Sequence, residues 1–200
     1  MSRIGIYSGT FDPVHAGHIA FALQSLQAAK LDRIYFLPER RPRDKQQVEH
    51  FAHRVAMIKR AIKPHPQFDV MELVDVSFSV ERTLPFLRKE FDGDELVFLF
   101  GSDVAAGLAV WPNSERLLDD SELVIGLRSQ DSGKELKKVI DKWPSQPKTV
   151  TMFPSYAPDV SSGLIREALR GRKPAKGSLN SVERYSDHNW LYVSLAVDAT

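Results

Sequence analysis

Short apolar runs alternate along this chain with longer segments in which apolar side chains return every three or four positions. The first pattern is typical of buried β-strands, and the second of helices with one apolar face. The predicted strands are residues 3–7, 33–37, 68–73, 95–100, 122–127 and 149–153. The predicted helices are residues 19–30, 51–62, 80–91, 161–170 and 180–187, although Pro85 interrupts the third of them.

Strands that alternate with helices in this way indicate an α/β fold, with a parallel sheet covered on both faces. A doubly wound, Rossmann-like sheet is expected over residues 1–158, followed by a small helical segment over residues 159–200. A length of 200 residues favours one domain. In such folds, ligands bind outside the carboxyl ends of the strands. Polar candidates at those ends are His15, His18, Lys45 and Asp103, and residues 161–166 follow the last strand.

Composition narrows the classes of function. The net charge is only +1, from 27 basic and 26 acidic residues, so neither a nucleic-acid partner nor a polybasic membrane surface is expected. The absence of cysteine excludes disulfides and thiolate metal sites. No apolar stretch has the length of a membrane span, and the first residues lack a signal-peptide pattern, so a cytoplasmic location is predicted.

The segment Gly-Thr-Phe-Asp-Pro-Val-His-Ala-Gly-His, residues 9–18, joins the first strand to the first helix. Gly9 and Pro13 permit a tight turn, and His15 and His18 are three positions apart, so they lie on one side of a helical turn. Backbone amides at a helix start and two imidazoles favour an anionic ligand such as a phosphate. A zinc site is the alternative, with Asp12 as an added ligand, but no further ligand lies nearby.

This segment resembles the signature of the His-x-Gly-His nucleotidyltransferase superfamily, and more narrowly that of its nicotinate mononucleotide adenylyltransferase branch. A second match is Ser-Ser-Gly-Leu-Ile-Arg at residues 161–166, where the family carries its other signature. The resemblance implies a nucleotidyltransferase-type fold and ATP-dependent adenylyl transfer to nicotinate mononucleotide in NAD biosynthesis. It also implies Mg²⁺ held mainly by the phosphates rather than by protein ligands.

The resemblance assigns roles residue by residue. The catalytic residues it implies are His15, His18 and Arg166. The ATP-binding residues it implies are Gly9, Thr10, Phe11, His15, His18, Gly101, Asp103, Ser161, Ser162, Ile165 and Arg166. Lys45, Arg54 and Trp111 match acceptor-binding positions of the branch, with Lys45 on the acceptor phosphate and Trp111 able to stack on a pyridine ring.

Three alternatives stay open. The acceptor could instead be nicotinamide mononucleotide or phosphopantetheine, whose adenylyltransferases share the first signature. A chain of another class, a non-catalytic nucleotide-binding protein, is suggested by Gly163, where the family usually carries threonine, and by Arg40 and Asp44, where asparagine and histidine are common. The intact His15, His18 and Arg166 argue against it. A dehydrogenase is not expected, because no Gly-x-Gly-x-x-Gly follows the first strand. The sequence leaves a homo-oligomer open.

Overall fold

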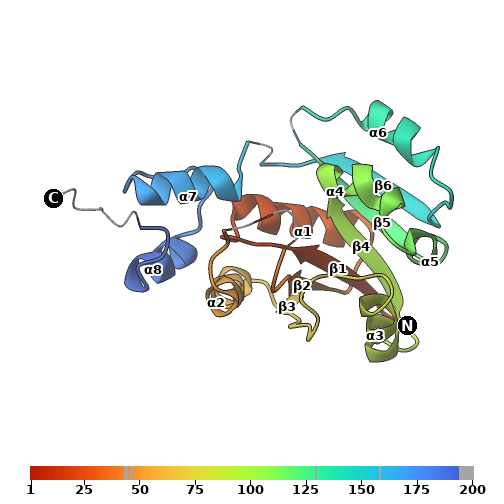
Figure 1. Cartoon of the computed structure of the whole chain (residues 1–200), viewed down its shortest axis with the longest axis horizontal. Coiled ribbons are helices and arrows are strands. Elements are labelled where there is room, and N and C mark those ends of the chain that lie inside the picture. Colours follow the sequence, from red (N-terminus) through yellow and green to blue (C-terminus); the bar gives the residue numbers. More distant parts are fainter. Residues whose placement is uncertain (43–44, 46, 129, 158, 194–200) are drawn as a thin grey trace.

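A six-stranded parallel sheet forms the centre of the protein (Figure 1). The computed structural model describes residues 1–42, 45, 47–128, 130–157 and 159–193. The strand order is β3-β2-β1-β4-β5-β6, so the chain starts in the middle of the sheet and winds outward in both directions. The predicted doubly wound α/β fold is therefore confirmed. The strands are β1 (Arg3–Gly9), β2 (Arg33–Pro38), β3 (Phe68–Val70), β4 (Glu95–Gly101), β5 (Glu122–Leu127) and β6 (Thr149–Pro154).

Helices connect the strands and then continue beyond the sheet. They are α1 (Ala16–Ala28), α2 (Phe51–Ile62), α3 (Thr83–Glu90), α4 (Ser102–Gly107), the 3₁₀ helix η1 (Leu108–Val110), α5 (Ser114–Leu118), α6 (Gly133–Ile140), α7 (Ser162–Arg170) and α8 (Asn180–His188). After β6 the chain crosses to α7, and α8 packs against α2 at the opposite end of the molecule from the amino terminus (Figure 1).

Three short helices, α4, α5 and α6, are absent from the sequence prediction, and several boundaries differ by one to three residues. The predicted strand 68–73 ends at Val70. The helix expected from residue 80 begins at Thr83, whose Oγ1 accepts the Ser79 N–H at 2.9 Å. Pro85 is then the third helical residue, where no intrahelical partner for an N–H exists and proline is tolerated.

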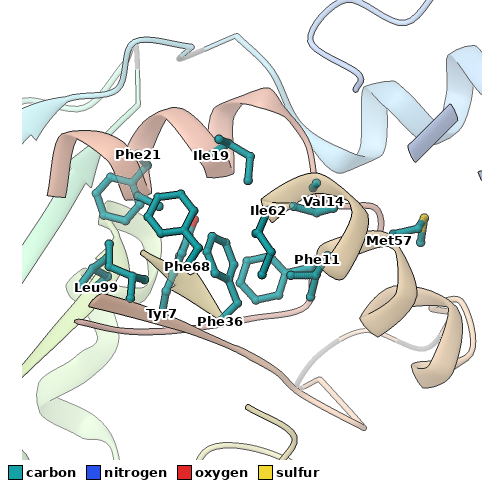
Figure 2. Close-up of a cluster of buried hydrophobic side chains, with 14 of the residues drawn as sticks. Tyr7, Phe11, Val14, Ile19, Phe21, Phe36, Met57, Ile62, Phe68 and Leu99 are labelled. Atoms are coloured by element: carbon teal, nitrogen blue, oxygen red, sulfur yellow. The ribbon is translucent and has the colours of Figure 1, made fainter. Parts of the chain in front are cut away.

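Successive apolar side chains of the central strands point to opposite faces of the sheet, so the core forms two layers. Tyr7, Phe36 and Leu99 face a cluster covered by α1, α2 and α8, which Figure 2 shows around Phe11 and Phe21. The side chains at the alternate strand positions point to the other face of the sheet. There they form the second cluster with α3, α4, α5 and α6. Each buried leucine or phenylalanine side chain contributes about 1.5–3 kcal/mol, so the two layers fix the sheet from which the site residues project.

Candidate active site

In the turn between β1 and α1, the aromatic side chain is buried and the backbone is exposed. Phe11 adopts a left-handed φ of 50°, and its ring is only 2% exposed. That ring packs edge-on against Tyr7, with centroids 5.2 Å apart, and a Cβ at Gly9 would lie 3.1 Å from it. The buried Phe11 ring anchors the turn, so glycine at position 9 lets the backbone approach it closely.

The two motif histidines stack at the start of α1. Their ring centroids are 3.7 Å apart, and the His15 backbone N–H donates to His18 Nδ1 at 3.2 Å. A neutral His18 that accepts at Nδ1 carries its proton on Nε2, which leaves Nε2 as a donor. His15 is 6% exposed, and its Nδ1 has no hydrogen-bond partner within the described chain. A Cβ at Gly17 would lie 3.0 Å from the His15 ring, so glycine there makes room for the stack.

Both imidazoles are held neutral. Burial, and then the nearby Arg128 charge, lowers the pKa of His15 to about 4. Burial also lowers the pKa of His18 well below its ordinary value, with further contributions from His15, Lys45 and Arg128. The pocket therefore disfavours added positive charge when it holds no anion, and an anionic ligand would relieve that cost.

The depressed pKa of His15 predicts a pH-dependent stability. Below pH 6.5 the unfolded chain binds a proton at His15, whereas the folded protein does not until about pH 4. Stability should therefore fall as the pH drops through this window, by about 3 kcal/mol from His15. Urea unfolding of the wild type and of His15→Asn, at pH 7, 5 and 4, measures this contribution. The variant keeps the other titrating groups, so equal pH dependence in both proteins would show that His15 is not held neutral.

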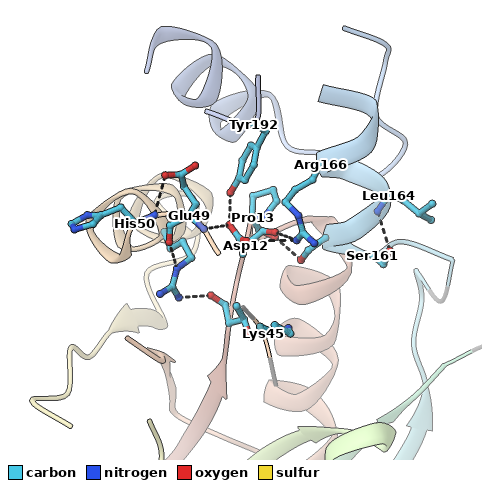
Figure 3. A network of polar contacts seen from close by, with 12 residues as sticks. Asp12, Pro13, Lys45, Glu49, His50, Ser161, Leu164, Arg166 and Tyr192 are labelled. Carbon is cyan, nitrogen blue, oxygen red and sulfur yellow. Dashed lines mark hydrogen bonds and ion pairs between the residues drawn. The ribbon is translucent and has the colours of Figure 1, made fainter. Parts of the chain in front are cut away.

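Three cationic side chains surround the histidines. Lys45 Nζ donates to Thr10 Oγ1 at 2.9 Å, and burial together with the Arg166 charge lowers the pKa of Lys45. Arg166 Nη1 donates to the Asp12 carbonyl and lies 3.6 Å from Asp12 Oδ2 (Figure 3). Arg128 forms an ion pair with Asp103 at 2.9 Å. These groups come from loops and a helix far apart in sequence, and all three line the same pocket.

The amino terminus of α7 is docked onto the same turn. Ser161 Oγ caps the helix by accepting the Leu164 N–H at 3.3 Å, and Ser162 Oγ donates to the Pro13 carbonyl at 2.9 Å. The helix dipole and free N–H groups at this end favour a phosphate. At Gly163 an added Cβ would come no closer than 3.8 Å to another atom, so the backbone does not require glycine there.

These elements meet in one pocket of about 820 Å³. Most predicted site residues line it: Thr10, Phe11, His15, His18, Lys45, Gly101, Ser161, Ser162 and Arg166. Its position at the carboxyl ends of β1, β4 and β5 is the place where doubly wound sheets bind ligands. A volume of this size is in the range of nucleotide-sized ligand sites.

Comparison with known proteins identifies the family. The sequence model of the cytidylyltransferase-like family matches residues 6–168. A nicotinate-nucleotide adenylyltransferase of Bacillus subtilis is 33% identical over 202 residues, which span 97% of this chain and 100% of the relative. The chain belongs to the cytidylyltransferase-like family. The predicted resemblance to nucleotidyltransferases of the nicotinate mononucleotide branch is confirmed.

Two further matches agree with this assignment. A probable nicotinate-nucleotide adenylyltransferase of Thermomicrobium roseum is 32% identical, over 96% of this chain and 92% of the relative. The solved structure of Plasmodium falciparum nicotinic acid mononucleotide adenylyltransferase complexed with NaAD has a TM-score of 0.78 at 19% identity, covering 96% of this chain and 98% of that chain. At that identity the structural likeness supports the fold.

Arg54, predicted to bind the acceptor, lies inside the protein. Its side chain is fully buried, and its guanidinium donates to the carbonyls of Glu49 at 2.9 Å, Thr10 at 2.7 Å and Arg40 at 3.1 Å. Burial lowers its pKa, and the charge of Asp12 partly offsets this. All of these acceptors are loop carbonyls, so in this member of the family Arg54 holds the loop before α2 against the phosphate-binding turn.

Four other predicted residues are also absent from the pocket wall. Trp111 packs against Phe78 and Phe100, with ring centroids 6.1 Å apart in both pairs. Ile165 lies on the buried side of α7 and is 1% exposed. The remaining two contact neighbouring residues: the Gly9 carbonyl accepts the Glu39 N–H at 3.0 Å, and Asp103 pairs with Arg128.

Several pocket residues were not predicted from the sequence, and Arg128 is the most important of them. It follows β5 directly, and the rule that singled out Lys45 and Asp103, a polar residue just after a strand, would have found it. Gly126 lies two residues before it, where a Cβ would lie 2.8 Å from the Phe21 ring. The absence of a side chain at Gly126 therefore keeps this part of the pocket open next to α1.

Protein ligands for a metal ion are scarce in the described ranges. No group of three or more histidine, cysteine, aspartate and glutamate side chains with metal-binding geometry occurs there. Asp103 is paired with Arg128, and Asp131 accepts from the Ser102 hydroxyl and the Arg128 N–H. Asp159 also lies on the pocket wall, so a cation there would depend mainly on ligands that a substrate brings. Among the same residues, no helix is long and apolar enough to span a bilayer.

Proposed function

We propose that this chain transfers the adenylyl group of ATP to nicotinate mononucleotide. The observation that carries the proposal is that His15, His18, Lys45 and Arg166 line one pocket at the carboxyl edge of the sheet. A phosphate oxygen of the mononucleotide attacks the α-phosphorus, and the bond from that phosphorus to the bridging oxygen of the β-phosphate breaks. The products are nicotinate adenine dinucleotide and pyrophosphate. Names of relatives, such as that from Bacillus subtilis, agree with this reaction.

The first signature serves the α-phosphate. The Thr10–Phe11 backbone and His18 Nε2 contact it, and His15 helps to hold the triphosphate beside the stacked His18 ring. A neutral donor suits this task, because the α-phosphate gains charge only in the transition state, when a pre-oriented N–H is most effective. No covalent intermediate is needed, since the acceptor phosphate already carries the nucleophilic oxygen.

The second signature serves the β- and γ-phosphates, which leave as pyrophosphate. Ser161 and Ser162 place the amino terminus of α7 at the pocket, and Arg166 lies one turn into the helix. Lys45, held on Thr10, is available for the acceptor phosphate. Bringing two polyanions into line is the main task of such a site, and opposing cations perform it. Asp103 keeps its proposed nucleotide role through Arg128, which lines the pocket, whereas Trp111 and Arg54 lie outside the pocket wall.

Mg²⁺ belongs to the proposal as a companion of ATP. Asp103 and Asp131 are already paired, and Asp159 is a further carboxylate on the pocket wall, so the triphosphate oxygens and water would supply most of its ligands. When bound, the ion would neutralise part of the phosphate charge. The cations of this chain would still be needed to align the two phosphate groups.

Turnover with an acceptor panel tests the proposal. Pyrophosphate release is measured with ATP, Mg²⁺ and either nicotinate mononucleotide, nicotinamide mononucleotide or phosphopantetheine. The proposal expects the highest kcat/KM with nicotinate mononucleotide. A preference for another acceptor would keep adenylyl transfer and overturn the substrate. ATP binding by calorimetry without turnover on any acceptor would instead favour the non-catalytic nucleotide-binding protein.

A further inference from the structure

Asp12 is a buried carboxylate at the junction of four segments. It is 2% exposed, and Figure 3 shows it between the first turn, α7, the loop before α2 and the carboxyl-terminal residues. Oδ1 accepts the Tyr192 hydroxyl at 2.7 Å and the Glu49 backbone N–H at 3.3 Å, whereas Oδ2 lies 3.6 Å from Arg166 Nη1. The proposed function gives Arg166 a role on the triphosphate but gives none to Tyr192.

The backbone conformation after α8 places the Tyr192 hydroxyl against the Asp12 carboxylate. Trp190 and Tyr192 both adopt left-handed conformations, with φ of 54° and 59°, which non-glycine residues rarely populate. The Leu191 N–H donates to the Ser186 carbonyl at 2.9 Å and holds the turn after α8 in place. Tyr192 is 8% exposed and packs in the first core cluster. Such conformations persist where the surrounding contacts over-determine them.

These contacts fix which oxygen of Asp12 faces Arg166. A carboxylate can present either oxygen, and two donors on Oδ1 turn Oδ2 toward the guanidinium. Arg166 also donates to the backbone carbonyl of Asp12, so one residue holds the guanidinium by two atoms. Without the Tyr192 hydroxyl, Oδ1 would keep only the longer bond from Glu49. The carboxylate could then rotate, and more of its charge would act on Arg166.

We propose that Tyr192 is a positioning residue for ATP, which orients Asp12 and through it the Arg166 guanidinium. The inference rests on the proposed function for the role of Arg166 on the triphosphate. It predicts that removing one hydroxyl at the carboxyl-terminal end of the fold weakens ATP binding, although that hydroxyl touches no substrate. Acceptor binding through Lys45 should change little, because Lys45 is held by Thr10.

Tyr192→Phe in the full chain tests the proposal. We expect KM for ATP to rise by about tenfold, as for the loss of a hydrogen bond to a charged group, with kcat and KM for nicotinate mononucleotide changing by less than about twofold. Tyr185→Phe is the matched control, because the Tyr185 hydroxyl interacts with His53 Nδ1 at 2.9 Å on α2 and does not line the pocket. This control should leave KM for ATP unchanged.

A double-mutant cycle separates positioning from a general loss of stability. Calorimetry with ATP, and with inorganic tripolyphosphate as a probe, compares Tyr192→Phe in the wild-type and Arg166→Met backgrounds. The effect should vanish when Arg166 is already absent. An unchanged affinity in Tyr192→Phe, or an equal loss in both backgrounds, would overturn the proposal. These binding measurements need no turnover, so a wild type that fails on the acceptor panel would refute the proposed function without deciding this one.

Discussion

His18→Ala is expected to lower kcat for pyrophosphate release by about a thousandfold, the effect of removing one pre-oriented donor to a developing charge. The imidazole is fixed by the His15 backbone N–H and by the contact with the His15 ring, so Nε2 is held in one orientation. The folded state should survive, because the substitution removes a group whose burial already disfavours its charged form. Steady-state kinetics with ATP and nicotinate mononucleotide, alongside thermal unfolding, measures both effects.

His65→Ala provides the control for this experiment. His65 packs beside Phe68, with ring centroids 5.2 Å apart, and does not line the pocket. Its replacement should leave kcat within about twofold of the wild type, as for a residue away from the reacting groups. Near-normal turnover in a folded His18→Ala protein would refute the role of His18 on the α-phosphate.

Arg54→Met is expected to lower the free energy of unfolding by about 3–5 kcal/mol, because three carbonyls that meet at a fully buried guanidinium lose their donors at once. Methionine replaces part of the volume but supplies no N–H. The Thr10 carbonyl belongs to the phosphate-binding turn, so ATP affinity should fall as well. Urea unfolding at pH 7 gives the stability, and calorimetry gives the affinity.

Arg60→Met is the matched variant on the same helix. Arg60 is exposed, donates to the Ala56 carbonyl one turn earlier and stacks over Tyr185 at 4.1 Å. Its loss should cost less than about 1 kcal/mol, as surface substitutions do. If Arg54→Met instead kept the stability of the wild type and raised only KM for the mononucleotide, Arg54 would be an acceptor ligand and its assignment to the loop would be wrong.

Periodicity located the six strands and the long helices, because each must bury an apolar face. It missed α4, α5 and α6, whose lengths of six, five and eight residues leave little room for a repeating pattern. Such short helices form because the sheet supplies the apolar surface on which they pack. The two signatures, in contrast, were sufficient to identify the nucleotidyltransferase family.

Several predictions remain predictions. The roles of the individual site residues, the single-domain division at residue 158, the cytoplasmic location and the number of copies in an assembly all await experiment. The departure from the branch at Asp44 lies outside the described residues. Gly163, which motivated the non-catalytic alternative, leaves space for a larger side chain in the pocket and does not distort α7.

The sequence by itself determined the fold class, the family and the residues that could handle phosphate, because strand periodicity and two signatures are local properties of the chain. Only the tertiary structure decided which of those residues face the ligand. Arg54 and Ile165 lie in or beside recognised motifs, yet the first is buried against carbonyls and the second in the core. Tyr192 and Asp12 are 180 residues apart and still touch. Contacts at such separations depend on how the helices pack on the sheet. A local sequence pattern contains no information about that packing.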